Sequence, residues 1–161
     1  MKLLSSNIED YLETITIISN KNNIVRVKDI SKEMGVSMPS VNKAIKILSK
    51  EKLVSHENYG YVELTEKGRI LGNTIYNSHN VLIKFLTEVL NVDYKIAQKD
   101  ACKIEHNISD ETLNRLIAFL KYIETFVSNK KINWIKDFNH FYKTYKTDKS
   151  LKKCKLERNL K

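Results

Sequence analysis

The segment VKDISKEMGVSMPSVNKAIKILSK, residues 27–50, decides the fold, because it holds two helical patterns joined by a tight turn. The first pattern ends at Met34, and Gly35 follows at the position where a left-handed residue closes a helix at little cost. Ser37 can cap the second pattern, and Pro39 lies in its first turn, where a missing N–H costs nothing. Two helices joined in this way, the second with a polar and basic outer side, are typical of a helix-turn-helix.

The sequence on either side of this segment predicts a further helix and a wing. Upstream, apolar residues at helical spacing predict a helix from Ser6 to about residue 20. Downstream, residues 53–56 and 61–64 are short β-like runs around Glu57-Asn58-Tyr59-Gly60. Two such runs predict a β-hairpin directly after the second helix of the pair. Three helices and a hairpin in this order form a winged helix-turn-helix.

The rest of the chain is predicted to be helical. Thr65 can cap a long helix that reaches about residue 90, a second helix follows over residues 93–107, and Ser109 can cap a third. Apolar and aromatic residues between Trp134 and Tyr145 predict a last helix. With one proline and four glycines in 161 residues, the expected fold class is mainly α. We expect a winged helix-turn-helix over residues 1–72, a helical domain over 73–148 and a basic, flexible C-terminal tail over 149–161.

The formal net charge of +9 suggests an anionic partner such as nucleic acid, but its distribution weakens that argument. Residues 1–72 and residues 73–148 each hold 11 basic and 9 acidic residues, so more than half of the excess lies in the tail. The local charge of one segment is a better indication of a nucleic-acid partner, because four lysines and one glutamate lie between Ser37 and Lys52. The absence of a long apolar run and the presence of only two cysteines predict a soluble, cytoplasmic protein with no membrane partner.

Three metal-ligand types lie on one face of the helix predicted over residues 93–107. Cys102, Glu105 and His106 occupy positions i, i+3 and i+4, so a thiol, a carboxylate and an imidazole point the same way. Each alone has a structural explanation, because a single cysteine often behaves as a small buried hydrophobe and a single carboxylate or imidazole is often solvated. Their coincidence on one face leaves a metal site and a structural role equally open.

Two further sets of residues have side chains that can bind a metal ion. Asp10 and Glu13 form an acidic pair at i, i+3 beside the apolar stripe of the first helix, although such pairs are common on solvated helix faces. His79 lies in the inward stripe of the long helix, where a neutral imidazole bonded to a carbonyl is the usual explanation. The residues alone do not indicate whether these features lie near Cys102.

Several blocks of sequence, taken together and in order, resemble one known family. They are Glu9-Asp10-Tyr11-Leu12-Glu13, Val36-Ser37-Met38-Pro39-Ser40-Val41, Leu53-Val54 with Tyr59-Gly60, Leu64-Thr65-Glu66-Lys67-Gly68, His79, and Asp100-Ala101-Cys102-Lys103-Ile104-Glu105-His106-Asn107-Ile108-Ser109. Over about residues 5–126 the chain resembles the metal-dependent transcriptional repressors of the diphtheria toxin repressor and manganese transport regulator (DtxR/MntR) family. The last block is the most specific of the set.

The resemblance implies a two-domain form of this family, without the C-terminal SH3-like domain. It implies a winged helix-turn-helix, a helical metal-binding and dimerisation domain, and a divalent metal bound between the two as co-repressor. It also implies a homodimer that binds a palindromic double-stranded DNA operator when metal fixes its geometry, represses metal-uptake genes and has no enzymatic activity or organic substrate. The metal ligands implied position by position are Asp10, Glu13, His79, Cys102, Glu105 and His106.

The ligand set departs from both branches of the family. Asp10 matches the manganese-sensing branch, whereas Cys102 matches the iron-sensing branch. Two positions of the iron branch's ancillary site hold Ile83 and Gln98, which argues against that site because isoleucine cannot coordinate. Hard oxygen ligands suit Mn(II) and a thiolate favours Fe(II), so the two remain equal candidates, while Co(II), Ni(II) and Zn(II) should also bind in vitro. The number of ions per subunit and the bridging role of Cys102 stay open.

The same implied fold assigns a DNA-binding surface. Base-edge contacts are expected from the start of the recognition helix and phosphate contacts from basic residues around it, with a wing tyrosine reaching the backbone. The residues are Arg26, Lys28, Ser37, Met38, Pro39, Ser40, Asn42, Lys43, Lys46, Lys50 and Tyr59. Two alternatives remain: a winged-helix regulator that senses an organic ligand, and a metalloenzyme with an open metal position.

Overall fold

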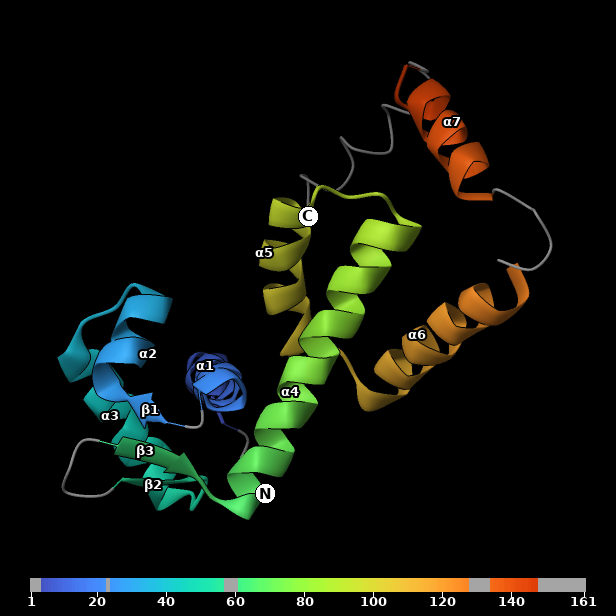
Figure 1. Ribbon diagram of the computed structural model, residues 1–161. Coiled ribbons are helices and arrows are strands. Elements are labelled where there is room, and N and C mark those ends of the chain that lie inside the picture. Colours follow the sequence, from blue (N-terminus) through green and yellow to red (C-terminus); the bar gives the residue numbers. More distant parts are fainter. Residues whose placement is uncertain (1–3, 23, 57–60, 128–133, 148–161) are drawn as a thin grey trace, which may run out of the picture. The chain divides into compact units, whose positions relative to one another are not determined.

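The computed structural model describes residues 4–22, 24–56, 61–127 and 134–147 (Figure 1). The chain forms two compact units, of which the first comprises the residues up to Leu82 together with Ala101–Asn107. The second comprises Ile83–Asp100 and the chain from Ile108 onward. The domain boundaries expected at residues 72 and 148 stay predictions.

The first unit begins with the three expected helices, α1 (Ser6–Asn22), α2 (Val27–Met34) and α3 (Met38–Lys50). Gly35 closes α2 in the left-handed conformation, with φ 66°, as its position predicts. Ser37 occupies the N-cap position of α3, but its hydroxyl pairs with the Ser40 hydroxyl at 2.9 Å and makes no capping bond to the backbone. The helix-turn-helix is therefore confirmed, with a different partner for its capping serine.

A three-stranded antiparallel sheet follows in the order β1-β3-β2. Strands β2 (Val54–His56) and β3 (Tyr61–Leu64) form the predicted hairpin, with Val54 opposite Leu64 and His56 opposite Val62. The unpredicted strand β1 (Val25–Arg26) pairs with the other edge of β3, Val25 lying opposite Val62. The mainly α fold with a winged helix-turn-helix is confirmed. Behind α3 and the sheet lies one buried apolar core, whose fully buried members include Leu12, Ile15, Ile30, Val41, Leu48, Leu53 and Val62.

Two glycines allow helix α4 (Glu66–Lys84) to approach the rest of the first unit closely. Thr65 caps this helix by accepting a bond from the Gly68 N–H at 3.0 Å. A Cβ on Gly68 would lie 1.8 Å from the Leu53 carbonyl oxygen, and one on Gly72 would lie 2.1 Å from Thr16 Oγ1. These contacts place α4 against Leu53, the residue before β2, and against α1, which determines where the later residues of α4 meet α1.

The remaining elements are helical, as predicted. They are η1 (Phe85–Val89), α5 (Tyr94–Glu105), α6 (Asp110–Tyr122), η2 (Ile123–Val127) and α7 (Trp134–Thr147). Ser109 caps α6 by accepting a bond from the Thr112 N–H at 3.3 Å. The segments η1 and η2 are π-helical, a local widening that apolar spacing does not indicate. Among the described residues, no helix is both long and apolar enough to cross a membrane. The expected tail, residues 149–161, lies outside the described residues.

Candidate metal centre and DNA-binding surface

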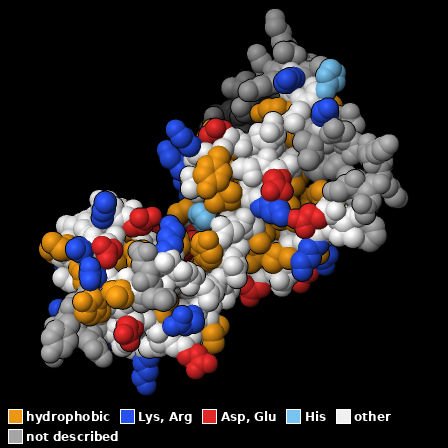
Figure 2. All heavy atoms as spheres, in the orientation of Figure 1, with side chains coloured by type: hydrophobic (Ala, Val, Ile, Leu, Met, Phe, Trp, Pro, Cys, Tyr) orange, Lys and Arg blue, Asp and Glu red, His pale blue; other side chains and the backbone are white. Residues whose placement is uncertain are grey.

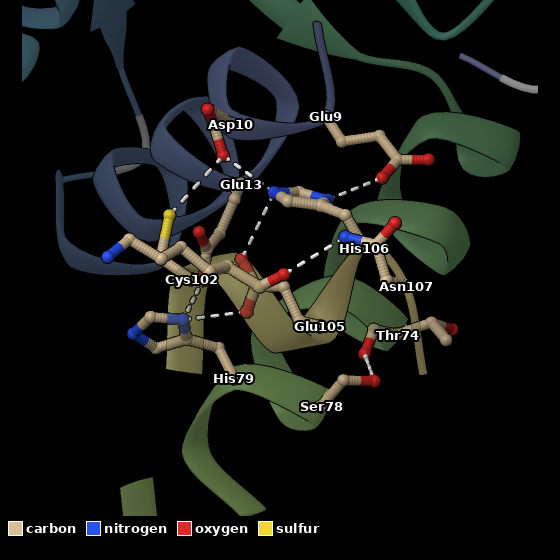
Figure 3. A network of polar contacts seen from close by, with 11 residues as sticks. Glu9, Asp10, Glu13, Thr74, Ser78, His79, Cys102, Glu105, His106 and Asn107 are labelled. Atoms are coloured by element: carbon tan, nitrogen blue, oxygen red, sulfur yellow. Dashed lines mark hydrogen bonds and ion pairs between the residues drawn. The ribbon is translucent and has the colours of Figure 1, made fainter. Parts of the chain in front are cut away.

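The structure brings the six predicted ligand residues together within the first compact unit (Figure 3). Helix α1 presents two carboxylates, α4 presents one imidazole, and the C-terminal end of α5 with the residue after it presents the rest. We refer to them as the six-residue cluster: Asp10, Glu13, His79, Cys102, Glu105 and His106.

One part of the cluster combines four ligand types. Ligand atoms of Asp10, Cys102, Glu105 and His106 all lie within 4.8 Å of one another. His106 Nε2 lies 2.9 Å from Asp10 Oδ1 and 3.5 Å from Glu105 Oε1. The Cys102 thiol donates to Asp10 Oδ1 over 3.8 Å. This spacing lets one ion reach all four side chains.

The other part of the cluster comprises Glu13, His79 and Glu105, again with ligand atoms within 4.8 Å of one another. His79 Nδ1 lies 2.6 Å from Glu105 Oε2 and 3.9 Å from Glu13 Oε1. Glu105 belongs to both parts and offers one carboxylate oxygen to each imidazole. It is therefore the residue on which the whole arrangement depends.

Two carboxylate oxygens of the cluster are buried and accept no hydrogen bond from any described residue, although an imidazole nitrogen lies 3.5–3.9 Å from each. They are Glu13 Oε1 and Glu105 Oε1, and the Glu105 side chain is only 1% exposed. A buried acceptor left unsatisfied costs free energy of about 1–3 kcal/mol, more when it is charged. A divalent cation would satisfy both oxygens, so the residues present fit such an ion in number, type and burial.

All four shifted groups of the cluster hold protons more tightly than usual. Burial, with the neighbouring charge of Glu105, raises the pKa of Glu13. Burial and the charge of Asp10 raise the pKa of the Cys102 thiol to about 11. Its hydrogen bond to Glu105 raises the pKa of His79. Burial opposes the charged form of His106, but bonds to Glu9 and Asp10 outweigh it and raise that pKa too. Protons thus offset an excess of negative charge that a cation could offset instead.

One residue of the site was not predicted as a site residue. Glu9 Oε2 accepts a hydrogen bond from Nδ1 of His106 at 2.7 Å, on the opposite side of the ring from Asp10 (Figure 3). In the sequence, Glu9 stands three residues after Ser6, a spacing that local helix capping explains. The only signal available was its place beside Asp10 and four residues before Glu13.

The predicted DNA-binding residues of α3 lie on its solvent side, opposite the buried Val41, Ala44, Ile45 and Leu48. We call the exposed residues the outer face of α3: Ser37, Met38, Pro39, Ser40, Asn42, Lys43, Lys46 and Lys50. Arg26 and Lys28 are also exposed, and the Arg26 guanidinium lies over the Tyr61 ring, 5.5 Å from its centroid. Tyr59 lies outside the described residues. Basic and acidic side chains are interspersed on the face of the molecule in Figure 2.

A winged helix-turn-helix with a cluster of metal-type ligands defines a class of protein, the metal-dependent DNA-binding regulators. Comparison with known families gives the same result. The model for the iron dependent repressor N-terminal DNA binding domain matches residues 3–62, and that for the iron dependent repressor metal binding and dimerisation domain matches residues 65–133. The chain belongs to this family, the DtxR/MntR family of metal-responsive, DNA-binding transcriptional repressors.

Individual relatives agree with this assignment. An uncharacterized HTH-type transcriptional regulator of Methanocaldococcus jannaschii is 36% identical over 119 residues, 73% of this chain and 95% of that protein. The HTH-type transcriptional regulator MntR of Bacillus subtilis is 30% identical over 129 residues, 80% of this chain and 90% of that protein. The solved structure of the manganese regulator SloR is similar at a TM-score of 0.64 and 35% identity, covering 71% of this chain and 54% of that one.

Proposed function

We propose that the six-residue cluster binds a divalent cation, Mn(II) or Fe(II), and that this binding switches the protein into its DNA-binding form. The observation that carries the proposal is a pair of buried oxygens, Glu13 Oε1 and Glu105 Oε1, that accept no hydrogen bond from the described residues. They lie among side chains that all offer ligand atoms, so a cation would remove a cost that the metal-free protein bears.

The donor set supports both metals. The carboxylates of Asp10, Glu13 and Glu105 are hard ligands that suit Mn(II), and a Cys102 thiolate adds preference for Fe(II) or softer ions. The similar protein SloR is a manganese regulator, which favours Mn(II) as the first ion to test. Co(II), Ni(II) and Zn(II) are expected to bind at least as tightly in vitro. Because Glu105 belongs to both parts of the cluster, the stoichiometry of a titration will tell whether one ion or two bind.

The ligands come from both halves of the family pattern. Asp10 and Glu13 lie in the segment that matches the DNA-binding domain, and the other four lie in the segment that matches the metal-binding and dimerisation domain. When bound, the cation supplies positive charge that turns repulsion among these carboxylates into attraction. The carboxylates of α1 then hold the DNA-binding half in one orientation. Roughly 3–5 kcal/mol of differential binding would carry the protein from a mostly inactive to a mostly active population.

In the active homodimer the two α3 helices would meet successive major grooves of a palindromic operator. Ser37, Ser40, Asn42 and Lys43 would contact base edges, and Met38 and Pro39 would contact thymine methyl groups. The phosphate contacts would come from Arg26, Lys28, Lys46 and Lys50, with Tyr59 on the wing. The output would be repression of metal-uptake genes in the cytoplasm when metal is abundant.

The test is fluorescence anisotropy on a duplex selected from a random pool by the protein, with parallel selections in Mn(II) and in chelator. We expect Mn(II) to increase the affinity of the wild type for DNA at least about 100-fold, in line with a coupling near 3 kcal/mol. The variants Asp10→Ala, Glu105→Ala and His106→Ala should not respond. Equal DNA affinity with and without metal would favour a sensor of an organic ligand, and turnover of ester or phosphate substrates would favour a metalloenzyme. Either result contradicts the proposal.

A further inference from the structure

We propose that Glu9 is a positioning residue for the six-residue cluster: its carboxylate holds the proton of His106 on Nδ1 and so leaves Nε2 to bind the cation. This inference rests on the proposed function, because it assigns a role towards the metal to a residue that is not itself a ligand. It concerns one hydrogen bond, between Glu9 on α1 and an imidazole 97 residues later in the chain.

The two ring nitrogens of His106 face different surroundings. Nε2 faces the ligand atoms, lying 2.9 Å from Asp10 Oδ1 and 3.5 Å from Glu105 Oε1. Nδ1 faces away from them and lies 2.7 Å from Glu9 Oε2. Figure 3 shows the ring between Glu9 on one side and Asp10 on the other. Only Nε2 can therefore serve as the ligand atom, and Glu9 stands behind the ring.

The chemistry of imidazole makes this arrangement useful. A neutral imidazole carries one proton, and the nitrogen without it offers the lone pair that binds a metal. A carboxylate that accepts a bond from Nδ1–H fixes this tautomer, orients the ring and makes Nε2 a stronger ligand. The His106 side chain is only 6% exposed, so water is poorly placed to replace Glu9. His106 also follows the last residue of α5, where the helix no longer fixes its backbone.

His79 provides an internal comparison. Its Nδ1 faces the cluster, where it meets Glu105 at 2.6 Å and Glu13 at 3.9 Å. Within the described residues, the structure gives its Nε2 no carboxylate partner like Glu9. Loss of Glu9 should therefore disturb the ring of His106 and leave the ring of His79 unchanged.

The experiment uses the full-length protein with Glu9→Ala, Glu9→Gln and a control, Glu66→Ala. Glu66 lies in the first turn of α4, as Glu9 lies in the first turn of α1, so the control matches the loss of a helix-start charge at an exposed position. Mn(II) titration gives the dissociation constant of each variant. Nitrogen-15 spectra of the Zn(II)-loaded protein, which is diamagnetic, report which nitrogen of each imidazole is protonated.

We expect Glu9→Ala to weaken Mn(II) binding about 10–100-fold, the usual effect of removing such a partner. Glu9→Gln should lose less, because its amide oxygen still accepts the bond, and Glu66→Ala should stay within about twofold of the wild type. In the Zn(II)-loaded wild type, His106 should carry its proton on Nδ1, with that proton protected from exchange. Glu9→Ala should lose the protection at His106 only.

The outcomes separate this inference from the proposed function. A wild type that binds neither Mn(II) nor Zn(II) overturns the proposed function and, with it, the role of Glu9. A wild type that binds metal while Glu9→Ala binds within threefold of it overturns the role of Glu9 alone. If Glu9→Ala does not fold, the wild-type and Glu9→Gln spectra decide, since a proton on Nε2 of His106 in the loaded protein contradicts the inference.

Discussion

The six-residue cluster and the outer face of α3 lie in the same compact unit, but their side chains are arranged in opposite ways. In the cluster, side chains from three helices converge, contact one another and are largely shielded from solvent. On the outer face of α3, side chains from one helix point into solvent, and Ser37 and Ser40 share a hydrogen bond there. An ion requires convergence of ligands at a point, whereas DNA requires an extended surface on a rigid support.

The comparison predicts how each region responds to substitution. Glu105 belongs to both parts of the cluster, so a substitution of Glu105 should affect the interactions of both parts. The outer face has a fully buried core behind it, so each exposed side chain should contribute nearly independently.

The largest expected effect follows from Glu105→Ala. This variant should lose detectable Mn(II) binding, and its affinity for DNA in Mn(II) should fall at least about 100-fold, to the level of the chelated wild type. Mn(II) should also cease to stabilise the protein, whereas at 100 times the dissociation constant it should stabilise the wild type by about 2.7 kcal/mol. Metal titration and thermal unfolding with and without Mn(II) measure both effects. Retained metal-dependent stabilisation would show that the cluster does not depend on its shared member.

The Gly72→Ala substitution is expected to disturb the six-residue cluster indirectly, through the contact between α4 and α1. The new Cβ would come within 2.1 Å of Thr16 Oγ1, one helical turn after Glu13 on α1, and Gly72 itself precedes His79 by two turns on α4. Either the Thr16 hydroxyl must leave its bond to the Leu12 carbonyl or the two helices must separate, and either shift should cost about 1–3 kcal/mol of stability. Separation of the helices should also weaken Mn(II) binding about tenfold. Urea unfolding and metal titration measure these losses.

A second substitution, at Thr16, tests whether the contact with Thr16 causes the losses in Gly72→Ala. Thr16→Ala removes the obstructing hydroxyl, so the double variant should recover most of the affinity for Mn(II). A double variant as weak as Gly72→Ala alone would mean that the spacing of α1 and α4 does not determine the cluster.

Much of the fold was predictable because its signals are local. Gly35, Thr65 and Ser109 mark helix ends through their own backbone and hydroxyl chemistry, and each has the expected position. Strand β1 was missed because it has only two residues, Val25 and Arg26, and exists through its pairing with β3. Such a strand has no periodicity of its own.

The site was predictable only in parts. The spacing of Cys102, Glu105 and His106 places them on one helix face, and this needs no tertiary information. That α1 and α4 meet them was implied by a family resemblance and not by spacing. The contact between Glu9 and His106 could not be predicted, because a glutamate near a helix start already has a local explanation.

The pH dependence of stability should distinguish the cluster from the exposed face. The pKa values of Glu13, His79, Cys102 and His106 are all raised, so the folded, metal-free protein binds more protons than the unfolded chain. For the histidines, the stabilisation is complete below their ordinary pKa of 6.5 and is lost as pH rises through the raised value. The raised pKa of Glu13 acts in the same direction above its ordinary 4.5.

The melting temperature in chelator should therefore fall between pH 5.5 and pH 8. Affinity for Mn(II) should rise over the same range, because the cation must displace these protons. Calorimetry in buffers of matched ionic strength and metal titration at each pH measure the two trends. A melting temperature that rises with pH in chelator would contradict the direction of the pKa shifts of Glu13, His79 and His106.

The smallest effect is expected on the exposed face, from Lys46→Ala. Lys46 is exposed on α3 and is expected to contact one phosphate, so its loss should weaken DNA binding by less than about tenfold and equally for all sequences. The slope of log affinity against log salt should decrease in magnitude by about 1 per subunit, since one counterion fewer is released. Mn(II) binding should be unchanged, because the side chain lies outside the cluster.

Lys121→Ala on α6 provides the matched loss of an exposed positive charge and should leave the slope unaltered. An altered Mn(II) affinity in Lys46→Ala would mean that the two regions are not energetically separate, and an unaltered slope would remove Lys46 from the DNA-binding surface.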